Sequence, residues 1–169
     1  MERLDVALKP VMLLEGPWEV SFDPAWGGPA SATFDTLTDW ARHAEEGVRH
    51  YSGTAVYRFA FEADAALSQA KRAVLDLGEV QVVAEVALNG QPLGTLWTPP
   101  WRVEATKALK AGTNVLEIRV TNLWPNRLIG DAALPKEKRL TETNMNTYKP
   151  DSPLLPSGLL GPVRLLVRP

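Results

Sequence analysis

Residues 84–96, Ala-Glu-Val-Ala-Leu-Asn-Gly-Gln-Pro-Leu-Gly-Thr-Leu, decide the fold class of this sequence. Asn89-Gly90 is the dipeptide that most strongly predicts a two-residue hairpin turn, because both positions tolerate a positive φ. The residues before it are rich in apolar strand formers, and strand-like residues resume directly after it. We therefore expect a strand over 80–88, a tight turn, and a second strand over 91–96.

Similar short stretches lie on both sides of this hairpin. Residues 115–120 alternate cleanly, with Leu116, Ile118 and Val120 on one face and more polar neighbours on the other. Further strand-like stretches are 18–22, 55–61, 73–77 and 163–167. Helical periodicity is weak, and only short turns are expected within 64–71 and 136–140. Many short strands separated by frequent turn residues predict an all-β sandwich or barrel.

One region interrupts this pattern. Residues 122–160 have little strand character and contain several prolines, so we expect one long irregular loop region there. Loops of that length in compact domains are usually functional or lie at interfaces.

Composition excludes several classes of protein. A chain of 169 residues suits one domain with a real core. The formal net charge of −2 gives no basic surface for nucleic acid, and no apolar run is long enough to span a membrane. The first residues do not have the pattern expected of a secretory signal. The absence of cysteine excludes thiolate chemistry and Cys-based metal sites, whereas the 6 Trp suit interfaces and sugar stacking.

Four motifs then carry a resemblance. They are Tyr-Ser-Gly-Thr-Ala-Val-Tyr-Arg at 51–58, the hairpin at 84–90, the stretch Leu-Lys-Ala-Gly-Thr-Asn-Val-Leu at 109–116, and Ser-Gly-Leu-Leu-Gly-Pro-Val-Arg at 157–164. In this order they resemble the sugar-binding domains of family 2 glycoside hydrolases, over roughly residues 14–168. Residues 123–131 and 151–158 look more like the C-terminal sandwich of family 106 α-L-rhamnosidases.

The resemblance implies a galactose-binding-domain-like jelly-roll β-sandwich that occupies residues 1–169 as a single domain. It also implies a module excised from a larger, multidomain bacterial enzyme, either α-L-rhamnosidase-like or β-galactosidase-like, whose catalytic domain precedes residue 1. The expected partners are that catalytic domain and a plant or algal polysaccharide. The expected location of the whole enzyme is periplasmic or extracellular.

The residues themselves give no sign of catalysis. Glycoside hydrolysis needs two carboxyl groups facing each other across a pocket. Glu45 and Glu46 are typical of an exposed charge run, and Asp131 and Asp151, if close in space, would suit a ligand or a cation better than catalysis. His43 and His50 have no third ligand pattern beside them, so surface or packing roles are favoured over metal or base roles. No G-x-S-x-G motif or phosphate-binding glycine loop occurs. We expect a non-catalytic domain.

Two segments combine aromatic side chains with planar hydrogen-bonding groups, which is the combination that sugars need. The candidate carbohydrate-binding residues are Trp97, Trp101 and Arg102 in the first segment, and Trp124, Asn126, Arg127 and Asp131 in the second. Because the loops of a sandwich cluster at its ends, the two segments could share one rim.

A structural reading competes with each of these assignments. Trp101 begins an inward-alternating stretch and could belong to the core. Trp124 could anchor its loop, with Arg127 and Asp131 paired as a clamp, because Arg–carboxylate pairs often order loops. Trp18 is expected to be buried. Trp26 and Trp40 are expected to cover an edge of the sandwich or to dock onto a neighbouring domain.

A structural calcium ion is a further possibility that the fold family raises. Calcium takes six to eight oxygen ligands, often from Asp, Asn and backbone carbonyls. The candidates are Asn122, Asp131 and Asp151, with Asn144 and Asn146 also on the long loop. No recognised loop motif joins them.

Two functions therefore remain open from the sequence. A carbohydrate-binding module would expose tryptophans beside polar side chains at one end of the sandwich. A structural module packing on the catalytic domain, and shaping the rim of its active site, would instead expose an apolar patch. The residues expected in that patch are Trp26, Trp40 and the segment 154–160.

Overall fold

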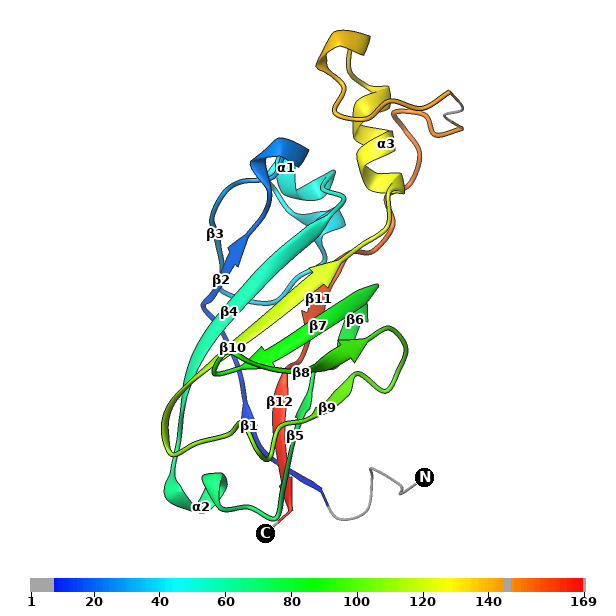
Figure 1. Cartoon of the computed structure of the whole chain (residues 1–169). Helices are drawn as coiled ribbons and strands as arrows, with labels where there is room; N and C mark the ends of the chain where they lie inside the picture. Colours follow the sequence, from blue (N-terminus) through cyan, green and yellow to red (C-terminus); the bar gives the residue numbers. More distant parts are fainter. Residues whose placement is uncertain (1–7, 145–146, 169) are drawn as a thin grey trace.

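The computed structural model describes residues 8–144 and 147–168 as a sandwich of antiparallel sheets (Figure 1). One sheet has four strands in the order β1 (Lys9–Leu13), β12 (Arg164–Arg168), β5 (Arg72–Asp76) and β9 (Arg102–Glu104). The other has six, in the order β3 (Ala32–Phe34), β2 (Trp18–Ser21), β4 (Thr54–Ala63), β10 (Gly112–Thr121), β7 (Val83–Leu88) and β8 (Gln91–Leu96). The all-β sandwich predicted from the sequence is confirmed.

Strands β4 and β10 form the centre of the larger sheet. They pair antiparallel over their whole length, from Thr54 opposite Thr121 to Ala63 opposite Gly112. Leu116, Ile118 and Val120 are completely buried on the inner face, as the alternating pattern predicts. Burial of each such side chain stabilises the fold by about 1.5–3 kcal/mol. The central pair therefore aligns the rest of the sheet.

The hairpin at Asn89-Gly90 joins β7 to β8 as expected. Asn89 and Gly90 have φ values of 54° and 77°, which suit a two-residue turn between twisted strands. The Asn89 side chain donates to Asn114 Oδ1 at 2.8 Å and accepts from the Val115 N–H at 2.9 Å. This turn is thereby fixed to the start of β10.

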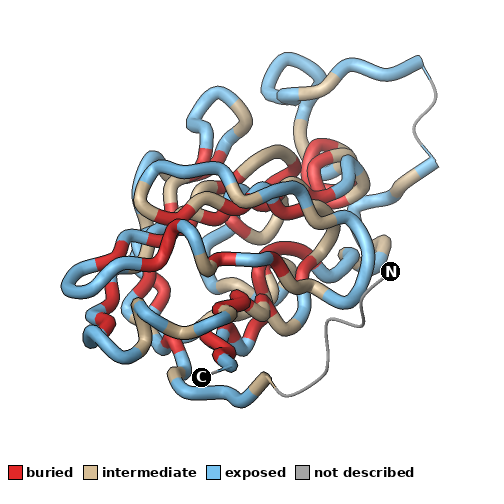
Figure 2. Tube along the Cα trace, turned by 60° about the horizontal axis from the view of Figure 1, so that its bottom comes forward, coloured by how far each residue is buried: buried red, intermediate tan, exposed pale blue. Residues whose placement is uncertain are grey.

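The core lies between the sheets, where the chain trace is mostly buried (Figure 2). Trp18 is completely buried, as predicted. Trp40 is also completely buried and donates from Nε1 to the Tyr57 hydroxyl at 2.6 Å. The expectation that Trp40 covers an edge or docks onto another domain is therefore wrong. It fails because a hydrogen-bond partner inside the core satisfies the indole N–H.

The expected strand over 80–88 is two strands. The first part is β6 (Glu79–Gln81), which leaves the large sheet and pairs with β11 (Gly158–Gly161) in a separate ribbon. The second part, β7, pairs with β10. The sequence does not reveal this change of partner, because Val80 before the break and Ala84 after it are both buried and no Gly, Pro or Asn separates them.

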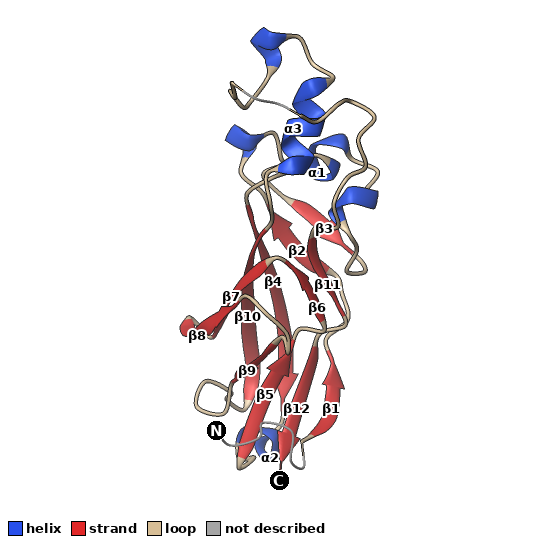
Figure 3. Cartoon of the chain, turned by 90° about the vertical axis from the view of Figure 1, so that its right-hand side faces the viewer, coloured by secondary structure: helices blue, strands red, loops and turns tan. Residues whose placement is uncertain are grey.

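Short helices gather mainly at one end of the sandwich (Figure 3). They are η1 (Pro24–Trp26), η2 (Trp40–Arg42), α1 (Glu46–Arg49), α3 (Pro125–Ala132) and η3 (Lys136–Lys138), with α2 (Ala65–Ser68) at the opposite end. The region 122–160 is thus not wholly irregular, since it holds α3, η3 and β11. Within the described residues, no helix has the length and apolarity needed to cross a bilayer.

Candidate functional site

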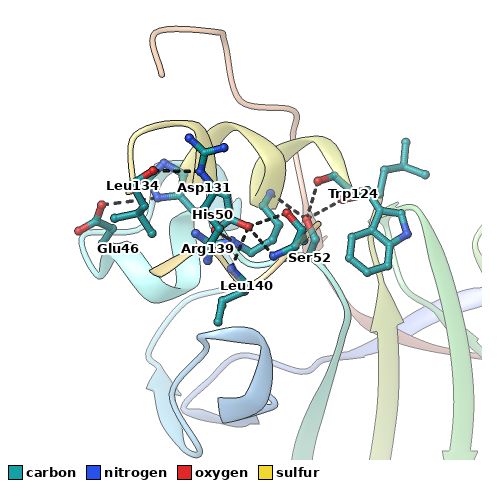
Figure 4. Close-up of polar contacts among 11 residues, drawn as sticks. Glu46, His50, Ser52, Trp124, Asp131, Leu134, Arg139 and Leu140 are labelled. Carbon is teal, nitrogen blue, oxygen red and sulfur yellow. Dashed lines mark hydrogen bonds and ion pairs between the residues drawn. The ribbon is translucent and has the colours of Figure 1, made fainter. Parts of the chain in front are cut away.

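Helix α3 projects beyond the end of β10 and is fixed to the sandwich at its first turn. Pro125 occupies the first helical position, where its missing N–H costs nothing. The buried Ser52 hydroxyl lies 2.9 Å from the Leu123 carbonyl oxygen and accepts from the Arg127 N–H at 3.0 Å (Figure 4). Ser52 therefore bonds both to the chain entering the helix and to the helix itself.

Asn126 is buried and hydrogen-bonded within the chain. Its side chain donates to the Leu155 carbonyl oxygen and accepts from the Leu155 N–H, both at 2.8 Å. The same amide nitrogen donates to Ser157 Oγ at 3.0 Å. Through these bonds the Asn126 side chain holds the segment that leads into β11. This favours a structural role for Asn126 over contact with sugar.

Arg127 and Asp131 lie one turn apart on α3, with Arg127 Nε 3.1 Å from Asp131 Oδ1. This is an ion pair without hydrogen-bond alignment between those two atoms. Both side chains are buried, and Asp131 Oδ2 accepts from the N–H groups of Leu140 and Thr141 (Figure 4). The pair joins the helix to the segment that follows η3, as the proposed clamp requires.

The first candidate segment lies between β8 and β9, beside the sandwich and away from α3 (Figure 1). Trp97 is 74% exposed, and Trp101 is half-buried and packs against the core. Arg102 forms an ion pair with Asp76, 2.9 Å from Nε to Oδ2. Trp97 is thus available to a ligand, whereas Trp101 also serves the core. The two segments do not form one rim.

Trp124, at the start of α3, is 54% exposed. It meets Trp26 of η1 edge to face, with ring centroids 5.3 Å apart and planes at 75°. Sequence reasoning did not pair these two residues, because no local pattern relates η1 to the end of β10. The Asp-Pro sequence before Trp26 did carry a helix-start signal, and Asp23 caps η1 by accepting from the Ala25 N–H at 2.9 Å.

The two histidines have packing partners. His43 stacks on Phe34 with centroids 5.1 Å apart, and its Nδ1 accepts from the Glu45 N–H. His50 lies against α3, with Nδ1 3.8 Å from Glu46 Oε1. Burial lowers the pKa of His50, and the positive charge of Arg127 lowers it further. These contacts favour packing roles for both residues.

The calcium candidates do not form an obvious ligand set. Asn122 is buried and donates to the Tyr51 carbonyl oxygen and Ser157 Oγ, while Asp151 is exposed. Asn144 is also exposed, and Asn146 lies outside the described residues. Within 8–144 and 147–168, no three His, Cys, Asp or Glu side chains group as metal ligands. A structural calcium ion stays a prediction.

A hollow of about 580 Å³ beside η3 is lined by three acidic residues, Asp131, Glu137 and Glu142, and by two basic residues, Lys136 and Arg139. Asp131 is the buried member, and its carboxylate is already occupied by Arg127 and by donors from residues 140 and 141. Such an acceptor is poorly placed to exchange protons with a substrate. The arrangement orders the chain.

The comparisons with known proteins agree with this fold. The family model described as "Glycosyl hydrolase 2 galactose-binding domain-like" matches residues 38–149. A solved rhamnosidase from Novosphingobium sp. PP1Y superimposes with a TM-score of 0.88 at 41% identity, over 95% of this chain and 15% of that protein. A Ruminococcus gnavus β-glucuronidase matches with a TM-score of 0.67 at 20% identity, over 96% of this chain and 31% of that one, which shows a shared fold.

The curated protein from Formosa agariphila named "Putative beta-glucuronidase" is 40% identical over 94% of this chain and 16% of its own length. The chain thus spans about one sixth of the curated relative and of the rhamnosidase. These matches confirm the predicted jelly-roll sandwich and the resemblance to sugar-binding domains of glycoside hydrolases.

Proposed function

Because the chain belongs to the glycosyl hydrolase 2 galactose-binding domain-like family, we propose that it is a non-catalytic, carbohydrate-binding accessory module of a bacterial glycoside hydrolase. The observation that carries this proposal is the likeness to one small part, 15%, of a rhamnosidase at 41% identity. In a protein of that length the catalytic groups have ample room outside the matched part. The exposed indole of Trp124 at the helical end of the sandwich supports contact with sugar.

The parent enzyme, in this proposal, hydrolyses a rhamnose-containing polysaccharide of plant or algal origin. The similarity to the Novosphingobium rhamnosidase supports this choice over a β-galactosidase-like or β-glucuronidase-like parent. A polymer too large to enter the cell is met in the periplasm or outside the cell, and we place the enzyme there. The module keeps the substrate near the catalytic domain and so raises its effective concentration.

Affinity electrophoresis tests this proposal. The 169-residue chain is run through native gels containing rhamnose-rich, galactose-rich or glucuronate-rich polysaccharides, with bovine serum albumin as the non-binding standard. Retardation in the rhamnose-rich gel is the expected result. Unchanged mobility in every gel would contradict carbohydrate binding.

A second function is favoured by a separate observation, the apolar side chains exposed around α3. Leu123, Leu140 and Leu155 are each at least 40% exposed and lie on or near this projecting end. Exposed apolar groups that gather in one place are typical of interaction surfaces. In this alternative the module is purely structural: it packs on the catalytic domain and shapes the rim of its active site.

Co-purification with the separately expressed catalytic domain of the parent enzyme distinguishes the two functions. The structural function predicts that the double variant Leu123→Ser/Leu155→Ser no longer co-purifies with the catalytic domain. The matched control is Val115→Ser, which changes an equally exposed side chain on β10. No co-purification with the unaltered chain would contradict the structural function and leave the carbohydrate-binding one standing.

A further inference from the structure

The pair formed by Trp26 and Trp124 borders a hollow of about 430 Å³ at the helical end of the six-stranded sheet. Pockets of roughly 300–1,000 Å³ are the usual size for small-molecule ligands. The hollow lies on the outer face of the sheet, since Thr54, Val56 and Arg119 line it and point away from the buried side of β4 and β10. It is separate from the hollow beside η3.

The polar lining of this hollow is held in place by the fold. The Asp23 N–H donates to the Tyr51 hydroxyl at 3.1 Å, and that hydroxyl donates to the Thr54 carbonyl oxygen at 3.0 Å. Asp23 Oδ1 accepts from the Ala25 N–H, which fixes the orientation of the carboxylate. Oδ2 has no partner among the described residues and is free to accept from a ligand.

A positive charge completes the lining. Arg119 lies on β10 with its side chain about half exposed, and its Nε is 3.6 Å from Glu85 Oε2. A guanidinium presents five N–H donors, so this single contact leaves donors for a ligand. The hollow therefore offers an acceptor at Asp23, donors at Arg119, and two indole surfaces.

This combination matches the chemistry of a pyranose ring. A sugar has an apolar C–H face that packs on an indole and a rim of hydroxyl groups that both donate and accept hydrogen bonds. The two indoles stand at 75° and so form a corner, whereas a flat row of aromatic rings would suit the middle of an extended chain. A corner closes around one ring and best fits the end of a chain.

We propose that Trp26, Trp124, Asp23 and Arg119 form a binding site for the terminal pyranose residue of a glycan. The proposal rests on the carbohydrate-binding function proposed above and names the site that performs it. Trp124 forms the exposed wall and Trp26 the half-buried wall. Asp23 orients the sugar by accepting hydrogen bonds from the hydroxyl groups of the sugar. Trp97 lies between β8 and β9, in a different part of the molecule, and takes no part in this site.

Isothermal titration calorimetry with rhamnose- and galactose-containing oligosaccharides tests the site. Calorimetry is preferred to fluorescence because replacing an indole removes its own signal. We expect Trp124→Ala to weaken binding at least tenfold and Asp23→Asn, which keeps the Oδ1 cap, to weaken it about fivefold. Trp97→Ala is the matched control, an exposed indole whose loss leaves affinity unchanged.

The outcomes separate this site from the proposed function. If the unaltered chain binds and Trp124→Ala binds equally well, the site is wrong while carbohydrate binding stands. If only Trp97→Ala loses affinity, the site lies between β8 and β9, and the proposal is overturned. If no oligosaccharide binds the unaltered chain, both proposals fail. Trp26→Phe, which keeps an aromatic ring in the core contact, provides a second variant should Trp124→Ala unfold.

Discussion

Asn122 and Asn126 donate to the same acceptor, the Ser157 hydroxyl oxygen, each from Nδ2 at 3.0 Å. Asn122 follows the end of β10, Asn126 lies in the first turn of α3, and Ser157 precedes β11. All three side chains are buried. One hydroxyl group therefore fastens both ends of the long segment that carries α3, and the position of Trp124 depends on it.

Replacing Ser157 with Ala should destabilise the domain. The change leaves one N–H of each asparagine amide buried without its acceptor, and such losses cost about 2 kcal/mol together. For a chain of this size that corresponds to a fall of roughly 4–8 °C in Tm. Differential scanning calorimetry measures it. Ser68→Ala is the control and should change Tm little, because the hydrogen bond of the Ser68 hydroxyl on α2 is exposed to solvent. Equal effects of the two variants would contradict the role of Ser157.

The Arg127–Asp131 pair should show strong coupling. Arg127→Ala leaves the buried Asp131 carboxylate without its cation, which should cost about 3 kcal/mol. The double variant Arg127→Ala/Asp131→Asn should lose less than the single variant, because it removes the uncompensated charge. Urea unfolding of all four proteins of the cycle measures the coupling.

A surface pair provides the comparison for that cycle. Arg58 and Glu117 lie on the exposed side of β4 and β10, with Nε and Oε2 3.0 Å apart. Exposed pairs of this kind contribute about 0–1 kcal/mol. If Arg127→Ala costs no more than Arg58→Ala, or if the double variant at 127 and 131 is the least stable, the buried clamp is not stabilising the fold.

The sandwich could be predicted because its signals are local. The alternation around Ile118 and the Asn89-Gly90 turn each lie within a few residues of sequence, and each determines the structure at its own position. The strand partners of β6 were not predictable in this way, because the pairing of Val80 with Leu159 depends on segments far apart in the chain.

Helix α3 was missed for a related reason. It has only 8 residues, and although Leu128, Ile129 and Ala132 recur at helical spacing, most of its buried side chains are polar: Asn126, Arg127 and Asp131. Their burial is possible only because Leu155 and residues 140–141 supply partners from later in the chain. The same residues look like ligand-binding groups in the sequence and are hydrogen-bonded internally in the fold.

His50 should make stability depend on pH. Burial lowers its pKa below the ordinary value of 6.5, with Arg127 and Arg49 acting in the same direction and Glu46 and Asp131 opposing them. The unfolded chain therefore binds a proton at a pH where the folded chain does not. The stability that neutral His50 contributes is fully present above about pH 6.5 and is lost as the pH falls from there towards the folded-state pKa.

Melting curves between pH 7.5 and 5.5 measure this effect, because most carboxylates remain ionised over that range. Tm of the unaltered chain should fall with decreasing pH, and His50→Gln should reduce the slope. His43→Gln is the control for replacing a histidine as such, since His43 stacks on Phe34 and not against α3. A slope unchanged by His50→Gln would assign the dependence to other groups.

Gly158 should tolerate no side chain. Its φ is +99°, and a Cβ built on it would lie 2.4 Å from Trp40 Nε1, the atom that donates to the Tyr57 hydroxyl. Gly158→Ala therefore combines backbone strain of about 1–2 kcal/mol with a clash against a core indole, for a total loss of about 3 kcal/mol or more. Gly112→Ala isolates the first contribution, because φ there is +83° and no atom lies within 4 Å of the added Cβ. Urea unfolding should show that Gly158→Ala lowers the free energy of unfolding more than Gly112→Ala does. A Gly158→Ala protein as stable as the Gly112→Ala protein would mean that Trp40 moves aside at little cost, and that β11 packs on the core less tightly than the burial of Gly158 and Leu159 indicates.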